Sequence, residues 1–151
     1  MCCALTDNMY TIYTNSTNAF DHFVLTTDQK AFLFTVNACR DVYLFLTHLP
    51  GVTDFEAYRI TLGVDENTRS SIYKTLPNET TFDASTNIFT CNTQALWVTW
   101  ADGTISVGEG SDVNQGQLFT WTDTQPYSVN ALAMASRDVN TVTWTLRRES
   151  G

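Results

Sequence analysis

Residues 95–108 read Ala-Leu-Trp-Val-Thr-Trp-Ala-Asp-Gly-Thr-Ile-Ser-Val-Gly, which is two apolar runs joined by Asp102-Gly103. Asp-Gly between apolar runs is a strong signal for a β-hairpin, because a type I′ turn needs positive φ at both of its central residues. A two-residue turn also fixes the register of the two strands. The expected pairs are Ala101 with Thr104, Trp100 with Ile105, Val98 with Val107, and Trp97 with Gly108.

This register divides the hairpin into two faces, because side chains alternate along a strand. Trp97 and Thr99 lie on one face, with Trp97 opposite a glycine. The other face is apolar and must pack in the core. It carries Leu96, Val98, Trp100, Ile105 and Val107.

The rest of the chain repeats short strand-forming runs between turns. Thr, Val, Ile, Phe, Tyr and Trp dominate these runs, and such residues are enriched in strands. No long stretch shows the 3.6-residue apolar period of an amphipathic helix. The predicted strands are residues 20–25, 31–38, 41–47 (with Val42, Leu44 and Leu46 on one face), 55–62, 71–75, 88–91, 118–121, 129–135 and 141–146.

The strand spacing predicts an all-β fold, a single-domain antiparallel β-sandwich of jelly-roll-like form, with less than about 10% helix. Residues 31–148 are expected to form the sandwich core, and residues 1–30 the N-terminal strand region of the same domain. A chain of 151 residues has the length of one domain. No change of composition along the chain marks a second one.

The chain is acidic, with 16 Asp and Glu against eight Lys and Arg, and its formal net charge is −8. The basic residues are scattered, so the surface lacks the basic stripe that a nucleic-acid backbone needs. Anionic membranes are disfavoured for the same reason, and no apolar run reaches the roughly 20 residues of a membrane-spanning helix. We therefore expect no nucleic-acid partner and no membrane insertion. Uncharged sugars meet no such electrostatic penalty.

The cysteines and the first residues bear on the cellular location. Four cysteines allow three pairings, which the sequence does not distinguish, and free thiols or an interchain link are open for Cys2 and Cys3. The first residues lack the basic and apolar regions of a signal peptide. Either a leader has been removed, or the protein is cytoplasmic, or it leaves the cell by another route. We expect an extracellular protein whose export route is unknown, with a cytoplasmic one as the alternative. Sequons at Asn15 and Asn78 matter only in the secretory pathway. The cysteines are Cys2, Cys3, Cys39 and Cys91.

Four blocks of sequence together point to a family. They are Val-Asn-Ala-Cys-Arg-Asp-Val-Tyr-Leu-Phe-Leu-Thr at 36–47, Tyr-Arg-Ile-Thr-Leu-Gly at 58–63 followed by Asn-Thr-Arg-Ser-Ser-Ile at 67–72, the hairpin extended to Gly110, and Phe-Thr-Trp-Thr-Asp at 119–123 with Pro126 and Val129. In this order they resemble the farnesoic acid O-methyltransferase-like (FAMeT-like) domain, over about residues 32–146. The resemblance implies an all-β fold, common in invertebrates and found among secreted and recognition proteins, some of which behave like lectins. The chain departs from the pattern at 137–140, where Arg-Asp-Val-Asn replaces a Gly-rich approach to the last strand.

The residues do not support the enzymatic name. A methyltransferase usually holds S-adenosylmethionine in a Gly-rich turn between a parallel strand and a helix, whereas Gly108-Glu109-Gly110 follows a hairpin strand. We expect His48 to be solvated in a surface loop and His22 to be structural. No nucleophile-elbow, P-loop or metalloprotease motif occurs. The expectation is a protein that is not an enzyme, with no catalytic residues, no metal and no cofactor.

Sugar recognition needs an aromatic face and several hydrogen-bonding side chains on a rigid scaffold. Residues 65–70, Asp-Glu-Asn-Thr-Arg-Ser, are the densest mixture of donors and acceptors in the chain. One alternative is an ordinary turn, in which Asn67 is left-handed and Arg69 pairs with Glu66. Trp97 can equally be covered by another strand, and Trp121 can lie in the core. The predicted ligand-binding residues are Asp65, Glu66, Asn67 and Arg69, with Trp97 or Trp121 as the aromatic partner and Asp123 beside the latter.

The favoured function is that of a lectin for neutral glycans, either oligosaccharides or glycoconjugates, acting in innate recognition or agglutination. A single shallow sugar site is weak, and several copies raise avidity by roughly 10²–10⁴, so we expect a homo-oligomer. The alternative is a non-catalytic protein-interaction or structural module. A methyltransferase is the third possibility.

Overall fold

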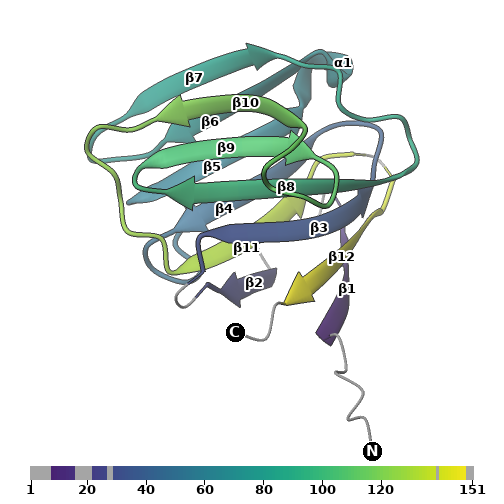
Figure 1. Ribbon diagram of the computed structural model, residues 1–151, viewed down its shortest axis with the longest axis horizontal. Coiled ribbons are helices and arrows are strands. Elements are labelled where there is room, and N and C mark those ends of the chain that lie inside the picture. Colours follow the sequence, from purple (N-terminus) through teal and green to yellow (C-terminus); the bar gives the residue numbers. More distant parts are fainter. Residues whose placement is uncertain (1–7, 16–21, 27–28, 139, 149–151) are drawn as a thin grey trace, which may run out of the picture.

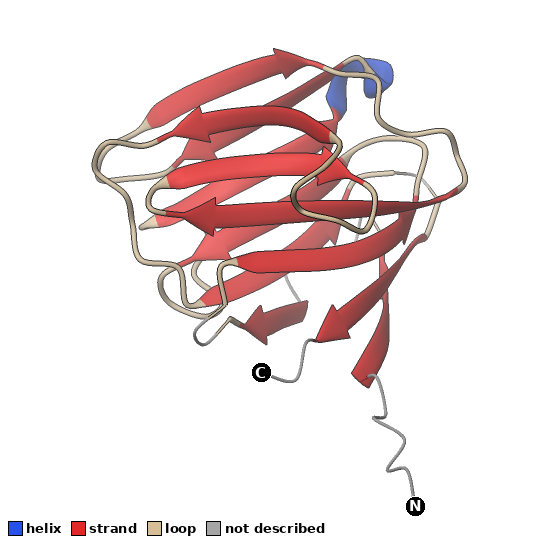
Figure 2. Ribbon diagram, in the orientation of Figure 1, coloured by secondary structure: helices blue, strands red, loops and turns tan. Residues whose placement is uncertain are grey.

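Two β-sheets pack face to face with the hydrophobic core between them (Figures 1 and 2). The computed structural model describes residues 8–15, 22–26, 29–138 and 140–148. Its strands are β1 (Asn8–Thr14), β2 (His22–Leu25), β3 (Ala31–Asn37), β4 (Val42–Thr47), β5 (Ala57–Gly63), β6 (Arg69–Lys74), β7 (Thr80–Ser85), β8 (Thr93–Ala101), β9 (Thr104–Glu109), β10 (Gln117–Thr122), β11 (Ala131–Ser136) and β12 (Val142–Arg148).

Each sheet has six strands, and all neighbouring strands run antiparallel. The order in one sheet is β1-β12-β3-β8-β9-β10, and we call it the β8 sheet; the order in the other is β2-β11-β4-β5-β6-β7, and we call it the β4 sheet. Among the described residues the one helical segment is α1 (Val64–Asn67), a single turn. The predicted antiparallel β-sandwich of jelly-roll-like form is confirmed.

The hairpin at residues 95–108 has the predicted geometry. In β8 and β9, Trp97 lies opposite Gly108 and Trp100 opposite Ile105. The φ angles at residues 102 and 103 are 54° and 78°, as a type I′ turn requires. The face predicted to be apolar is buried in the core.

Strand β4 shows how the alternation of side chains builds both a core and an outer surface. Val42, Leu44 and Leu46 are fully buried between the sheets, as predicted. The residues between them, Tyr43 and Phe45, point to the opposite face of the β4 sheet and belong to a separate small apolar cluster there. The outer face of this sheet therefore carries aromatic side chains.

Two local predictions were wrong. Residues 88–91 do not form a strand. Ile88 and Phe89 lie in a loop, and both are buried. The backbone of this loop bonds to side chains and not to a strand partner; for example, Gln94 Nε2 donates to the Ile88 carbonyl. Strand β7 was not predicted, because its sequence Thr-Thr-Phe-Asp-Ala-Ser is largely polar and occupies a sheet edge. An edge strand with a mostly exposed face gives a weak apolar signal.

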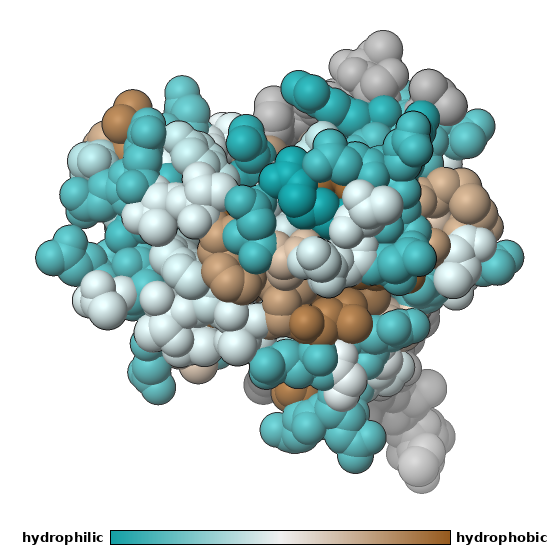
Figure 3. Space-filling model, turned by 90° about the horizontal axis from the view of Figure 1, so that it is seen from above, coloured by the Kyte–Doolittle hydropathy of each residue, from teal (hydrophilic) through white to brown (hydrophobic). Residues whose placement is uncertain are grey.

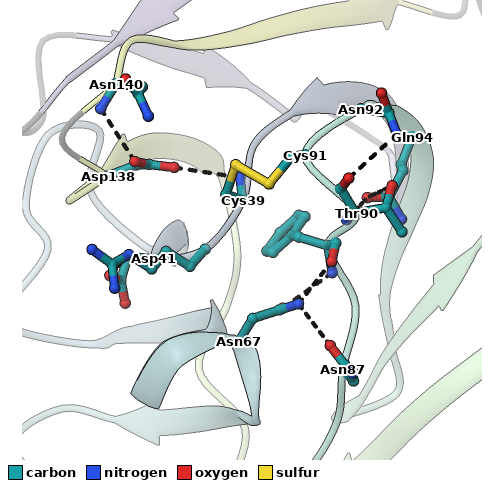
Figure 4. The surroundings of a disulfide bond; sticks show 12 residues. Cys39, Asp41, Asn67, Asn87, Thr90, Cys91, Asn92, Gln94, Asp138 and Asn140 are labelled. Atoms are coloured by element: carbon teal, nitrogen blue, oxygen red, sulfur yellow. Dashed lines mark hydrogen bonds and ion pairs between the residues drawn. A yellow bond between two sulfur atoms is a disulfide. The ribbon is translucent and has the colours of Figure 1, made fainter.

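A disulfide joins Cys39, just after β3, to Cys91, just before β8 (Figure 4). It ties the β3–β4 connection to the β7–β8 connection across 52 residues of chain. Beside it, the backbone N–H of Cys39 donates to the buried Asp138 carboxylate at 3.3 Å, and the N–H of Asn140 donates to the same group at 3.1 Å. Asp138 thus anchors the segment in which the chain departs from the family pattern. Cys2 and Cys3 lie outside the described residues.

Candidate functional site

A groove of about 910 Å³ lies on the outer face of the β4 sheet. Its floor crosses β11, β4, β5, β6 and β7, and the side chains that line it are those that alternate with the core residues of these strands. The loops after β4 and after β6 contribute to its rim. A rigid sheet with loops at its ends is a common scaffold for binding surfaces.

The strand register arranges the floor in two rows that run across the strands. Each row combines aromatic, hydroxyl and charged side chains. One row is Phe45, Arg59, Tyr73 and Thr81, and the next is Ala135, Tyr43, Thr61, Ser71 and Asp83.

The two ends of the groove differ in chemistry. Leu76, which is 52% exposed, lies at one end. Asp54 and Glu79 lie near it on the rim. At the other end Arg69 begins β6, and Arg137 follows β11. One end of the groove therefore combines an apolar side chain with carboxylates, and the other end carries two arginines.

Two arginines of the groove lie over tyrosine rings. The guanidinium of Arg59 lies 5.0 Å from the centre of the Tyr73 ring, and that of Arg137 lies 6.0 Å from the centre of the Tyr43 ring. Such cation–π contacts are attractive and hold both partners in place. Partial burial raises the pKa of both tyrosines, helped at Tyr73 by a hydrogen bond to Glu79.

Arg69 is the point at which the predicted loop meets the groove. Its Nε donates to Asp65 at 2.8 Å, and its Nη1 donates to Asp83 at 2.7 Å. The partner of Arg69 is thus Asp65 and not Glu66, which the alternative reading of the loop had paired with it. These two ion pairs hold the guanidinium at the end of the groove floor.

Asn67 has a structural task in the same turn (Figure 4). Asp65, Glu66 and Asn67 have φ angles of 51°, 58° and 64°, so the left-handed Asn67 of the alternative reading is present. Its Nδ2 donates to Asn87 Oδ1 and to the Phe89 carbonyl at 2.7 Å, and its Oδ1 accepts from the Phe89 N–H at 3.1 Å. These bonds use the polar groups of the Asn67 side chain to fix the loop after β7.

Trp97 lies on the opposite sheet, away from the groove. It points off the core face as predicted, but only 1% of it is exposed. Its ring packs on Gly108, where an added Cβ would come within 2.0 Å of the ring, and its Nε1 donates to the Gln115 carbonyl at 3.0 Å. The loop between β9 and β10 thus holds Trp97 in place.

Asp123 and Trp121 lie at one end of the sandwich interior. Asp123 is 7% exposed and accepts hydrogen bonds from Lys74 Nζ and the Tyr58 hydroxyl, both at 2.7 Å. Burial alone would raise the pKa of Asp123, but the bonds from Lys74 and Tyr58 outweigh burial and lower it. Trp121 packs edge-on against Tyr58, with ring centres 6.2 Å apart.

The structure brings few of the seven predicted residues together. Arg69 lines the groove with Asp65 bonded to it, whereas Trp97, Trp121 and Asp123 lie elsewhere. Among the described residues, no group of three or more His, Cys, Asp or Glu side chains is arranged to hold a metal ion. The groove residues that sequence reasoning missed are Tyr43, Phe45, Arg59, Tyr73 and Arg137; the alternation in residues 42–47 already placed the first two on the outer face.

No described helix has the length and apolar character that crossing a membrane requires.

Solved structures with a similar fold include a galectin and two glucanases. The galectin of Caenorhabditis elegans is 12% identical with a TM-score of 0.56, and the match covers 91% of this chain and 94% of the galectin. The Bacillus licheniformis β-glucanase is 9% identical with a TM-score of 0.53, and the match covers 84% of this chain but only 66% of the enzyme. A prokaryotic β-1,3-1,4-glucanase (lichenase) from a mouse hindgut metagenome is 9% identical with a TM-score of 0.53, over 95% of this chain and 79% of that one. At these identities the likeness shows the fold alone.

No curated protein matches the chain by sequence. The family described as farnesoic acid O-methyl transferase matches residues 9–150. This span contains all four blocks that carry the resemblance. The chain therefore belongs to the farnesoic acid O-methyl transferase family.

Proposed function

We propose that this domain is a non-catalytic carbohydrate-binding module and that its glycan lies in the groove of the β4 sheet. The observation that carries the proposal is the groove floor, where aromatic and hydroxyl side chains from β4, β5, β6 and β7 stand in register. The similar folds of a galectin and of glucanases support a sandwich suited to carbohydrates.

The groove chemistry matches the two sides of a sugar ring. A pyranose has apolar C–H faces, which can pack on Tyr43, Tyr73 and the exposed Leu76. Its hydroxyls can bond to groups that both donate and accept, such as Ser71 and Thr81 on the floor. Sites of this kind are mostly apolar with a few well-placed polar groups.

Methyl transfer is not part of the proposal, despite the family's name. In the part of the chain that the structure describes, every strand pair is antiparallel and α1 has four residues. The parallel strand, Gly-rich turn and helix that usually hold S-adenosylmethionine are not formed there. Calorimetry with S-adenosylmethionine tests this reading: micromolar binding would contradict it.

We further propose that the protein is secreted and oligomeric, which would suit a lectin of innate recognition or agglutination. The Cys39–Cys91 disulfide supports an oxidising compartment. An apolar area at the centre of the face shown in Figure 3 supports self-association. Several copies would raise the avidity of a weak site, and light scattering after size exclusion measures the number of copies.

The experiment is a glycan array followed by titration of the best ligand. Tyr43→Ala and Tyr73→Ala should each weaken binding about tenfold or more, by analogy with the stacking of bases on aromatic side chains. The matched control is Tyr13→Ala, because Tyr13 is 58% exposed on β1 of the other sheet. Circular dichroism should show an unchanged fold for all three variants.

Two outcomes would argue against this function. If no glycan on the array binds the wild type, the alternative of a protein-interaction or structural module is favoured. If a glycan binds and both groove variants bind it like Tyr13→Ala, the glycan site lies outside the groove.

A further inference from the structure

We propose that the ligand of the groove is an acidic oligosaccharide, whose anionic groups bind Arg59 and Arg137. This inference rests on the proposed function, and it names the substrate class of the same site. It departs from the neutral glycan expected from the net charge, because the net charge is an average over the surface and the groove differs from that average.

The groove lining is less acidic than the chain as a whole. Only eight Lys and Arg residues are present in the chain, and three of them, Arg59, Arg69 and Arg137, line the groove. Three carboxylates also line it, those of Asp54, Glu79 and Asp83. The groove lining is therefore neutral in a chain of net charge −8, and an anion is repelled less there than over the rest of the surface.

The carboxylates leave two of the three arginines unpaired. Arg69 forms ion pairs with Asp65 and Asp83. Arg59 and Arg137 are exposed, and neither guanidinium has an ion pair or a hydrogen bond with any residue that the structure describes. Asp41, which interacts electrostatically with Arg137 across the strand pair, has its carboxylate paired with Arg40 at 3.7 Å. The neighbouring Asp138 is buried and accepts from the N–H groups of Cys39 and Asn140.

The unpaired guanidinium groups are held ready for a ligand. Each lies over a tyrosine ring, Arg59 at 5.0 Å and Arg137 at 6.0 Å from the ring centre. This contact restricts the side chain while leaving its N–H donors unused, so less freedom is lost when an anion binds. The planar donor fork of arginine matches the two oxygens of a carboxylate or a sulfate. The hydroxyls of a neutral sugar can also accept from this fork, but without the charge assistance that an anion adds.

The spacing of the tyrosines beneath the two arginines favours an extended ligand. The rings beneath them, Tyr43 on β4 and Tyr73 on β6, lie two strands apart and two register positions apart along the strands. Their Cα atoms are then about 12 Å apart, from strand spacing and rise per residue. Anionic groups on different rings of one oligosaccharide would suit this spacing.

The test is titration of the full chain with matched sets of oligosaccharides. Each set holds a uronic acid oligosaccharide, its neutral form made by reducing the carboxyl groups, and a sulfated derivative of that neutral form; several linkages are used. The wild type should bind an acidic member at least tenfold more tightly than its neutral form, since charge-assisted hydrogen bonds are the stronger ones, and this preference should shrink with salt. The carboxylate and sulfate arms identify which anion the groove takes.

Variants assign the preference to the two arginines. Arg59→Gln and Arg137→Gln should each lower the affinity for the acidic member about tenfold more than they lower the affinity for its neutral form. Lys30→Gln is the control, because it removes the same charge from an exposed position outside the groove.

Each other result overturns the inference in a recognisable way. Equal affinity for acidic and neutral forms, unaffected by either arginine variant, overturns it and leaves the proposed function standing. An equal loss with Lys30→Gln shows attraction by overall charge and overturns it as well. Binding of neither form in any set overturns the inference and the proposed function together.

Discussion

The Lys74 ammonium lies 2.7 Å from the Asp123 carboxylate, and both side chains are almost completely buried. Lys74 also donates to the Gln125 carbonyl at 2.8 Å and lies 4.6 Å from the centre of the Tyr127 ring. The pair thus joins β6 of one sheet to the segment that follows β10 of the other. Asp123, predicted to face a ligand, instead holds the two sheets together at one end.

Asp123→Asn should lower the free energy of unfolding by about 3–5 kcal/mol, because it leaves the Lys74 ammonium buried without a counter-charge. Urea denaturation at neutral pH measures this change. Glu66→Gln is the matched control, since Glu66 is exposed and surface substitutions stay within about 0.5 kcal/mol. A loss as small as that of the control would mean that the Lys74–Asp123 pair does not stabilise the fold.

The same ion pair predicts how stability depends on acid. The folded pKa of Asp123 lies below its ordinary value of 3.8, because the bonds from Lys74 and Tyr58 outweigh burial. A lowered folded pKa adds stability at pH values above the unfolded pKa, and this stability is lost as the pH falls through the folded pKa. The stability advantage of the wild type over Asp123→Asn should therefore be constant above about pH 5 and shrink below the ordinary pKa. An advantage that grows on acidification would refute this assignment.

Removal of the disulfide should destabilise the domain through its unfolded state. Cys39 and Cys91 close a segment with a sequence separation of 52, and in the chain-entropy model such a cross-link contributes about 4 kcal/mol. The double substitution Cys39→Ala with Cys91→Ala should lower the unfolding free energy by that order. A reducing agent should lower the stability of the wild type and leave that of the double variant unchanged. Equal sensitivity to the reducing agent would rule out a stabilising bridge between these two cysteines.

The hairpin was predictable in detail because its determinants are local. Asp102-Gly103 selects the turn, the turn sets the register, and the register alone places Trp97 opposite Gly108. What covers the outer side of Trp97 was not predictable, because the loop carrying Gln115 reaches it only in the folded chain.

That contact gives a prediction for Gly108→Ala. The added Cβ would lie 2.0 Å from the Trp97 ring, so the ring or the strand must move. We expect the unfolding free energy to fall by about 1–3 kcal/mol, as for other overpacked sites. Fluorescence of the tryptophans during urea denaturation measures both the stability and any change around Trp97. A variant as stable as the wild type would show that Trp97 packs elsewhere.

The groove could not be predicted from local sequence. Its floor joins Tyr43 and Tyr73 only because β5 lies between β4 and β6 in the sheet. The dense polar stretch at 65–70 led to the prediction of a site at the turn. In the structure the polar groups of Asn67 are bonded to the loop after β7. Polar density marks hydrogen-bonding capacity, and a left-handed turn uses much of that capacity itself.

Variants of Arg69 and Asn67, two residues apart, distinguish a ligand site in the groove from one on the turn. Arg69→Ala removes a groove donor and leaves the Asp65 and Asp83 carboxylates unpaired at the groove end, so affinity for the best glycan should fall about tenfold or more. Asn67→Ala instead removes three bonds that fix the loop at Phe89, so the unfolding free energy should fall by about 1–3 kcal/mol while glycan affinity changes little. Titration and urea denaturation of both variants measure the two effects. If Asn67→Ala weakens glycan binding more than Arg69→Ala does, the ligand contacts the turn itself and the groove is not its site.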